Sequence, residues 1–410
     1  MGDDVALTVR MLAATELDDR LVTRRCEIGI NAVTSATDTT ATAEAIESLR
    51  VLDLPLDDLV ATEAVASDAG AEAGPPLVER MILTEERDGT WRVTVSGSDV
   101  DRAATVTNAT ADPVEIADQV LNAVTLRHLF RPAPARLHGG AVARDDGAVA
   151  LVLGPSGTGK STMVAHLAAG GLDLLNDEQV ALHPAHGVVA AFTRPLVCKP
   201  AGAVHLPEPL ATTWASRRGT LLVRAADLGT RHRVVGTPAL VVIARRDATA
   251  DPAVEQLGAV EAAKVLMDNN LDLLARPHDA LAAFGWLVTT TPVLRVTYRT
   301  SAEGAAVVRG LLEAPPEPAG GSWWVWPEST AADNAAPTEP SPMLRAAPHA
   351  VGLGFDDGVV LLNTATATAT TCNDTAAALW ASLPAAAWPE GPEVAAFVSS
   401  LREAGLLAPE

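Results

Sequence analysis

The first 112 residues alternate apolar and polar positions in short runs, a pattern typical of β-strands. One of these runs covers residues 90–96, whereas residues 40–51 repeat apolar positions at the spacing of a helix. No catalytic motif occurs in this part of the sequence. The pattern predicts a β-rich N-terminal α+β domain over residues 1–112, to which the sequence assigns no role.

Residues 113–313 alternate predicted strands and helices, which is the order of elements in an α/β domain. A helix is predicted over residues 113–130 and a strand over residues 137–143. A turn at residues 145–147 predicts a hairpin between this strand and an apolar strand at residues 148–153. Further predicted elements are helices at residues 160–169, near 259–276 and near 301–313, and strands at residues 180–182, 220–223, 240–244 and 293–297.

The sequence beyond residue 313 contains a predicted linker and then a small second domain. Residues 314–342 are rich in proline, glycine and small polar residues, a composition typical of a linker, and the domain covers residues 343–410. Within the linker, the run of tryptophans at residues 323–326 is too apolar to stay exposed to water. We expect it to pack against a domain in preference to a partner protein.

Length, charge and cysteine content limit what the protein does and where. The 410 residues suffice for two or three domains. The net charge of −21 disfavours nucleic acids and anionic membranes as partners, because both reward a basic surface, and it favours a basic peptide or protein. The three cysteines form no CxxC pair, and no stretch reads as a signal peptide or a membrane span. We expect a cytoplasmic protein, and whether it forms a homo-oligomer stays open.

The strongest chemical motif follows the predicted strand at residues 148–153. The sequence GPSGTGKST completes the phosphate-loop pattern G-x-x-x-x-G-K-[ST] between a predicted strand and a predicted helix. In such a loop, backbone N–H groups surround phosphate oxygens, Lys160 supplies a cation to the β and γ phosphates, and the Ser161 hydroxyl ligates Mg²⁺. The motif predicts binding of ATP, with GTP left open, and of Mg²⁺. The predicted nucleotide-binding residues are Gly154, Pro155, Ser156, Gly157, Thr158, Gly159, Lys160, Ser161 and Thr162.

An acidic segment follows the next predicted strand. Residues 172–175, with the sequence Leu-Asp-Leu-Leu, lead into Asn176, Asp177 and Glu178, and this order of strand and then acid resembles a Walker B element. Because few residues separate Lys160 from Asp177, we expect the acidic strand to lie close beside the phosphate-loop strand. The alternative is that the two acids only open a surface loop.

Four elements in this order resemble one group of phosphate-loop proteins. They are His138, the phosphate loop, residues 176–178 and residues 192–199, and together they look like the HPr kinase/phosphorylase-related kinases. The resemblance covers residues 113–313 and implies a P-loop kinase core that uses ATP and Mg²⁺. Phosphoryl transfer of this kind needs positioning and charge neutralisation, without a covalent enzyme intermediate.

The resemblance also implies catalytic roles for the residues that match. Asp177 corresponds to the base that accepts the proton of the attacking hydroxyl, and Ser161, Asp177 and Glu178 correspond to the groups around Mg²⁺. Glu178 departs from the paired aspartates usual in the family, and its longer side chain could change the metal geometry. His138 is expected to orient the acid or contact a phosphate, and a structural role beside Gly139 is the alternative.

Three cations complete the implied site. Lys160 contacts the transferred phosphates, whereas Arg194 and Lys199 bracket Pro195 in an apolar stretch. Long cations at a strand edge neutralise a phosphate or hold a substrate. The alternative for Arg194 and Lys199 is that they are ordinary surface cations.

Residues 343–410 resemble a second family. They contain an Asp-Gly turn at residues 357–358 between apolar runs, Asn373 at a helix start, Trp380 on that helix, and a final helix within residues 394–407. This order looks like the winged-helix-like PqqD-like fold that recognises precursor peptides of the RiPP class. The resemblance implies that a leader peptide adds as a strand to the sheet edge. A module that only packs on the kinase or mediates dimers is the alternative.

Together the two resemblances favour an ATP-dependent kinase acting on a ribosomally made precursor peptide. The acceptor is a Ser or Thr hydroxyl, and the peptide is captured through residues 343–410. Tethering a peptide-binding module to an active site raises the effective concentration of the acceptor. Two other functions stay open: a nucleotide-gated scaffold that hands the peptide to other enzymes, and a small-molecule kinase whose C-terminal module serves only assembly.

Overall fold

The structure is a computed structural model of the full chain. It describes residues 7–17, 20–33, 74–85, 91–97, 104–110, 112, 114–119, 133–208, 214–216, 219–327, 344–384 and 388–408. The helix expected over residues 40–51 lies outside the described residues. Of the helix expected over residues 113–130, residues 114–119 are described and are helical.

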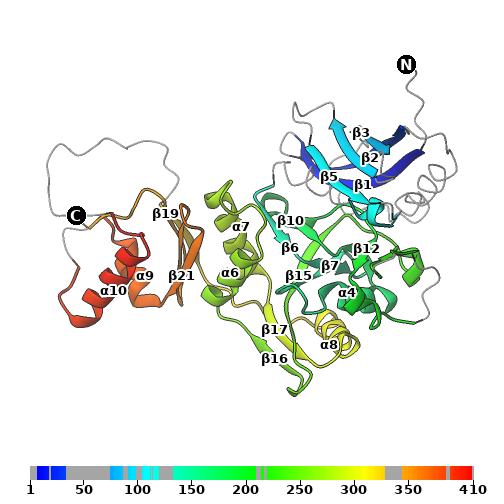
Figure 1. The fold of residues 1–410 in the computed structure, drawn as a ribbon. Coiled ribbons are helices and arrows are strands. Elements are labelled where there is room, and N and C mark those ends of the chain that lie inside the picture. Colours follow the sequence, from blue (N-terminus) through cyan, green and yellow to red (C-terminus); the bar gives the residue numbers. More distant parts are fainter. Residues whose placement is uncertain are drawn as a thin grey trace.

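The N-terminal part forms a five-stranded sheet in which the strands follow their order in the sequence (Figure 1). Strands β2 and β3 pair in parallel and the other neighbours pair antiparallel. The strand expected at residues 90–96 is confirmed as β4. The strands are β1 (Leu7–Leu17), β2 (Arg20–Val33), β3 (Gly74–Glu85), β4 (Trp91–Gly97) and β5 (Ala104–Thr110).

The central part is built on a nine-stranded mixed sheet. Strand β8 lies inside it, parallel to β15 and antiparallel to β7, and β17 continues the parallel set beside β15. The predicted α/β class of this region is confirmed at this level. The strands are β6 (Ala135–His138), β7 (Gly140–Ala143), β8 (Ala148–Leu153), β9 (Asp173–Asn176), β10 (Gln179–His183), β11 (Val188–Ala190), β15 (Val235–Arg246), β16 (Ala253–Gln256) and β17 (Val293–Tyr298).

Helices cover both faces of this sheet. Side chains of alternate β8 residues point to opposite faces, and from Val149 onward both sets are buried. Leu151 packs in the core with α6 and α7, whereas Val152 packs in the core with α4 and α8. A strand buried on both faces reads as a continuous apolar run, which is what the sequence of β8 shows. The helices are α4 (Lys160–Ala169), α6 (Ala259–Asp268), α7 (Pro277–Thr290) and α8 (Ser301–Glu313).

A small three-stranded sheet and a short helix stand beside the large sheet. The order of the strands is β12-β14-β13, all antiparallel. The short helix follows β12 directly and places residues 199–203 near α4. These elements are β12 (Leu196–Cys198), α5 (Pro200–Ala203), β13 (Trp214–Ala215) and β14 (Leu221–Val223).

The C-terminal part is a four-stranded antiparallel sheet with two helices. The predicted hairpin turn and helix start are confirmed: β19 and β20 flank the turn, and the Asn373 side chain accepts the N–H of Ala376 at 3.0 Å. Trp380 is fully buried in the core of this part. The elements are β18 (Trp323–Trp326), β19 (Ala350–Phe355), β20 (Gly358–Asn363), β21 (Thr368–Cys372), α9 (Asp374–Ala381) and α10 (Pro392–Glu403).

The tryptophans at residues 323–326 pack against a domain, as expected. They form β18, which pairs with β19 at one edge of the C-terminal sheet. The Trp326 ring meets the Trp380 ring edge-on, with centroids 5.1 Å apart. Trp323 lies on the backbone of Gly285 in α7, where a Cβ atom would stand 2.5 Å from the indole ring. The stretch predicted as a linker therefore contributes a strand that contacts both neighbouring parts.

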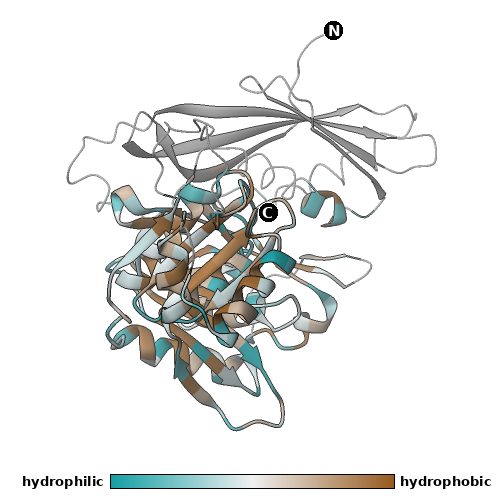
Figure 2. Ribbon diagram, turned by 90° about the vertical axis from the view of Figure 1, so that its left-hand side faces the viewer, coloured by the Kyte–Doolittle hydropathy of each residue, from teal (hydrophilic) through white to brown (hydrophobic). Residues whose placement is uncertain are grey.

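Helices α6 and α7 lie between the large sheet and the C-terminal sheet (Figure 1). One face of β19 and β20, including Leu353 and Val360, joins the same apolar core as these helices, while Leu361 on the other face packs with α9 and α10. Apolar residues gather in the interior strands and helices, as the colours of Figure 2 show. Among the described residues, no helix combines the length and the apolar character needed to cross a membrane.

The structure corrects three predicted elements. The strand expected at residues 137–143 is divided into β6 and β7 at Gly139, where a Cβ atom would stand 2.4 Å from the Leu153 side chain. The helix expected over residues 259–276 ends at Asp268, and a second helix, α7, which begins at Pro277, was not predicted. The strand expected at residues 240–244 is longer in both directions.

The contact between α7 and β18 gives a stability prediction. Gly285→Ala forces the Trp323 ring away from α7, so we expect a loss of about 1–3 kcal/mol in the free energy of unfolding. Gly310→Ala in α8 is the matched control, because no atom lies within 4 Å of the position of its added Cβ. We expect this variant to gain about 0.5–1 kcal/mol from helix propensity. Urea denaturation measures both, and equal effects would contradict the contact.

Candidate active site

The phosphate loop connects the carboxyl end of β8 to α4. Gly159 precedes the helix with φ +91°, a left-handed conformation that favours glycine, and an added Cβ would stand 3.0 Å from Ser301 Oγ. The buried Tyr298 hydroxyl donates to the Thr158 carbonyl at 2.7 Å, which fixes the loop to β17. Burial raises the pKa of Tyr298 to about 12, so this hydroxyl keeps its proton and remains a donor.

Lys160 lies inside the loop that it is expected to serve. Its Nζ donates to the carbonyl of Gly154 at 2.7 Å and to that of Pro155 at 3.2 Å. Burial lowers the pKa of Lys160, and the nearby Glu178 carboxylate opposes that effect. Among the described residues, the ammonium group donates hydrogen bonds to backbone carbonyls alone, and it can exchange them for phosphate oxygens.

A cleft of about 390 Å³ opens beside the loop. Of the nine predicted nucleotide-binding residues, six line it: Ser156, Gly157, Gly159, Lys160, Ser161 and Thr162. The other three are not part of its lining and instead shape the loop. Thr158 donates its hydroxyl to the Pro155 carbonyl at 2.9 Å, and Gly154 takes φ +138° with its carbonyl on Lys160.

The acidic segment enters this cleft from the end of β9. Strand β9 pairs with β7, which pairs with β8, so one strand separates it from the phosphate-loop strand. The buried Asn176 side chain accepts the N–H groups of Glu178 at 2.7 Å and Gln179 at 3.0 Å. Its amide group donates to the Phe192 carbonyl at 2.7 Å. These contacts hold the turn that presents Asp177 and Glu178.

Asp177 is buried at the bottom of the cleft beside Arg194. The Asp177 Oδ1 and the Arg194 Nε are 3.7 Å apart, and Asp177 Oδ2 accepts the N–H of Val197 at 3.1 Å. Both side chains are 1% exposed. Burial raises the pKa of Asp177, and the Arg194 guanidinium counteracts this. The result is a carboxylate of higher basicity than a surface aspartate, held in place by a cation and a backbone donor.

Glu178 and His138 form a second pair at the cleft. The His138 Nδ1 lies 3.1 Å from the Glu178 carbonyl oxygen and 3.4 Å from Glu178 Oε1. Both neighbours are acceptors, so Nδ1 carries the proton. The hydrogen bond from His138 lowers the pKa of Glu178, which keeps this carboxylate charged. The structure thus brings together all four predicted catalytic residues, Asp177, His138, Lys160 and Arg194, in one cleft.

Sequence reasoning missed several residues of the site. Arg246, at the end of β15, lines the cleft and adds a cation to the exposed Lys199, which was predicted. Asp118 and Cys198 also line it, and burial raises the pKa of the Cys198 thiol to about 12, so the thiol stays protonated. Position at the carboxyl edge of the sheet was the signal that could have identified Arg246.

Asn269 was missed as well, although it touches two parts of the site. Its side-chain oxygen accepts the N–H of Gly154, with 3.3 Å between nitrogen and oxygen, and its carbonyl accepts the N–H of His138 at 2.7 Å. Asn269 follows the last residue of α6. The end of α6 is thereby joined to the phosphate loop and to β6.

The donor set at the cleft fits Mg²⁺. Asp177 Oδ1 is buried and has no hydrogen-bond partner in the part of the chain that the structure describes. Ser161, Asp177 and Glu178 supply hydroxyl and carboxylate oxygens, which Mg²⁺ prefers. Over the described ranges, no group of three or more His, Cys, Asp or Glu side chains is arranged as a metal site. A Mg²⁺ that uses few protein ligands together with phosphates and water agrees with this finding.

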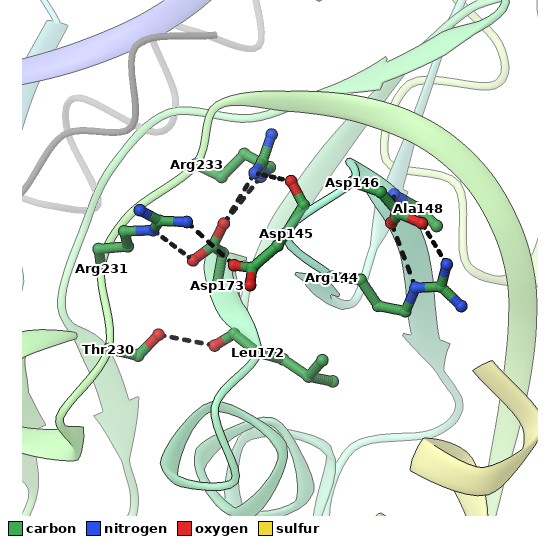
Figure 3. A network of polar contacts seen from close by, with 9 residues as sticks. All are labelled: Arg144, Asp145, Asp146, Ala148, Leu172, Asp173, Thr230, Arg231 and Arg233. Carbon is green, nitrogen blue, oxygen red and sulfur yellow. Dashed lines mark hydrogen bonds and ion pairs between the residues drawn. The ribbon is translucent and has the colours of Figure 1, made fainter. Parts of the chain in front are cut away.

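A network of ion pairs fixes β9, the strand that leads to Asp177 (Figure 3). Arg231 Nε donates to Asp173 Oδ1 at 2.9 Å and Arg233 Nε donates to Asp173 Oδ2 at 3.0 Å. The same two arginines reach Asp145 in the turn between β7 and β8, one at its carboxylate and one at its carbonyl, both at 3.0 Å. Since Asp173 and Arg233 are buried, the network holds the start of β9 against that turn.

Comparisons with known proteins identify no family for this chain. No protein-family model matches the chain, and no curated protein matches it. Among solved structures, the chain is similar to the HPr(Ser) kinase/phosphatase from Coxiella burnetii, with 12% identity and a TM-score of 0.24, over 43% of this chain and 94% of the other. A similarity of this size carries no argument about fold or activity, which depend on the site itself.

The segment beside β9 gives a pH-dependent stability prediction. His232 lies between the two arginines of the network, is 3% exposed, and burial lowers its pKa to about 4. His232 is neutral in the folded protein. Its contribution to the free energy of unfolding is therefore complete above its unfolded pKa near 6.5 and decreases as the pH falls towards 4, by up to about 3 kcal/mol in total. We expect His232→Gln to flatten this slope. Urea midpoints between pH 7 and pH 4.5 measure it, and identical slopes in both proteins would contradict the burial argument.

Proposed function

We propose that the chain is an ATP-dependent phosphotransferase that phosphorylates a Ser or Thr hydroxyl of a ribosomally made precursor peptide. The observation that carries this proposal is the buried Asp177, whose Oδ1 has no hydrogen-bond partner among the described residues, in the same cleft as the phosphate loop. A phosphate-binding loop alone supports nucleotide binding. A basic carboxylate beside it supports transfer to a hydroxyl.

In the proposed reaction, the acceptor hydroxyl oxygen forms a bond to the γ-phosphorus. The bond between that phosphorus and the β,γ-bridging oxygen breaks, and this oxygen leaves with the electron pair as part of ADP. The hydroxyl proton passes to a carboxylate oxygen of Asp177. Arg194 keeps that carboxylate oriented, and the raised pKa of Asp177 favours acceptance of the proton.

Cations around the cleft supply the charge that a triphosphate needs. Lys160 lies in the loop, Lys199 stands at the start of α5, and Arg246 stands at the end of β15. These side chains approach from three different elements, an arrangement suited to several phosphate groups. Ser161, Asp177 and Glu178 would hold Mg²⁺, which when bound supplies further positive charge to the phosphate oxygens.

The C-terminal sheet supports the peptide as the substrate. Strand β21 is an edge strand of this sheet within the described residues, and a peptide can add to such an edge by backbone pairing. A groove lies next to it, lined by α6 residues such as Val260 and Lys264 and by Thr371 of β21. The acidic chain, with a net charge of −21, favours a basic peptide. A scaffold that binds nucleotide and peptide without turnover is the competing outcome of the test below.

Asp177→Asn tests the chemical step. We expect this variant to lose about 10²–10⁴-fold in kcat at saturating Mg²⁺ and ATP, because the amide cannot accept the proton. The measurement is the intact mass of the precursor peptide encoded beside the gene after incubation with Mg²⁺ and ATP, which rises by about 80 Da per phosphoryl group in the wild type. Asp268→Asn, an exposed carboxylate outside the lining of the cleft that pairs with Lys264, is the control and should keep most of the activity. Binding of ATP and peptide with no mass change supports the scaffold.

Glu178→Gln tests the metal role separately. The amide oxygen is a weaker ligand than the carboxylate, so we expect the free Mg²⁺ needed for half-maximal activity to rise roughly tenfold, equivalent to about 1.4 kcal/mol. At saturating Mg²⁺, kcat should recover much further than in Asp177→Asn. Rates measured across a Mg²⁺ titration give this concentration. An unchanged Mg²⁺ requirement would contradict the assignment of Glu178 as a Mg²⁺ ligand.

A further inference from the structure

Helix α6 contacts the nucleotide cleft at its C-terminal end. Asn269 accepts the Gly154 N–H with its side chain and the His138 N–H with its carbonyl. The Asn269 amide nitrogen also donates to the Val265 carbonyl at 2.8 Å, one turn back in the helix. This bond orients the side chain, so that its oxygen faces the loop. Any movement of the helix end therefore reaches the first residue of the phosphate loop directly.

The other end of the same helix contacts the C-terminal sheet. The Asp357 carboxylate, in the turn between β19 and β20, accepts the Val260 N–H with 3.4 Å between nitrogen and oxygen. An added Cβ at Gly258 would stand 2.8 Å from the same carboxylate oxygen. A carboxylate near the N-terminus of a helix is favourable because it meets unsatisfied N–H groups and the positive end of the helix dipole.

A continuous apolar core links these two ends. Leu153 of β8, the α6 residues Leu266 and Met267, and Leu353 and Val360 of the C-terminal sheet all belong to one cluster of buried side chains. Interiors of this kind are close-packed and transmit displacement instead of absorbing it. With ten residues at about 1.5 Å each, α6 is roughly 15 Å long, and this length separates its contact with Asp357 from its contact with the phosphate loop.

We propose that Asn269 is a positioning residue for the phosphate loop and that α6 couples the C-terminal sheet to nucleotide binding. The inference rests on the proposed nucleotide site. A peptide strand on β21 would contact the sheet and the groove of α6, and the helix would pass the change to Gly154 and His138. In this arrangement, the C-terminal sheet sets the affinity of the nucleotide cleft as well as delivering a substrate.

Nucleotide affinity without any peptide tests the first half. The probe is a fluorescent ADP analogue with Mg²⁺, titrated against the full chain. Asn269→Ala removes the acceptor of the Gly154 N–H, so we expect Kd to rise about 3–10-fold. Asp268→Ala is the matched control, because this exposed neighbour pairs with Lys264 and, among the described residues, makes no hydrogen bond to the loop. Its Kd should equal that of the wild type, and equal values for all three proteins overturn the positioning role.

Two adjacent aspartates in one turn test the second half. Asp357 accepts a hydrogen bond from α6, whereas Asp356 accepts the Ser322 hydroxyl at 2.7 Å and makes no hydrogen bond to the helix among the described residues. We expect Asp357→Ala to raise the nucleotide Kd about 2–5-fold and Asp356→Ala to leave it unchanged. Melting temperatures of both variants show whether the sheet remains folded. Equal affinities in the two folded variants overturn the coupling.

A double-mutant cycle between the two ends of α6 measures how strongly Asn269→Ala and Asp357→Ala are coupled in their effects on the nucleotide Kd. The sites are too far apart for direct contact, so independent effects on log Kd would add. Transmission through the helix predicts that Asp357→Ala has little further effect once Asn269→Ala has removed the contact with the loop. Additive effects overturn the inference. Because no peptide is present, a failure of peptide phosphorylation would change none of these readings, whereas it would overturn the proposed kinase activity.

Discussion

The structure depends on the burial of α6 and α7 between two sheets. These helices fill the space between the large mixed sheet and the C-terminal sheet, and one apolar core includes all of them. The C-terminal sheet consequently has no free inner face, since Leu353 and Val360 are buried against the helices. A truncation that removes this sheet would expose part of the central core, so the folding of the central part depends on the C-terminal sheet.

The chemistry of the cleft depends on a balance between burial and compensating charge. Asp177 is buried enough for its pKa to rise, yet Arg194 and a backbone donor keep it in one orientation. The pKa of Glu178 is shifted in the opposite direction, because the hydrogen bond from His138 favours the charged form of this carboxylate. Two neighbouring acids with pKa values pushed in opposite directions are suited to two roles, one moving a proton and one holding a cation.

The sequence predicted what local pattern determines. The phosphate loop, the acids after β9 and the cap at Asn373 each need particular residue types at fixed spacing, and the structure places them accordingly. Contacts between distant segments were not predictable in this way. Asn269 lies 115 positions from Gly154. In the sequence it looks like any residue that ends a helix, and only the folded chain places it beside the loop. Arg246 was missed for the same reason, because only the pairing of β15 with β8 places it at the cleft. The β6 and β7 boundary depended on close packing at Gly139, which periodicity does not report.

The tryptophan strand β18 has a consequence for how this protein meets other chains. By pairing with β19, it occupies one edge of the C-terminal sheet, and β21 is the opposite edge within the described residues. Unpaired edges are where sheets of separate molecules join. Within the described residues this sheet has two edge strands, β18 and β21, and the chain's own β18 already covers the edge of β19. Self-association through this sheet and capture of a foreign strand would therefore compete for the backbone groups of the same two strands.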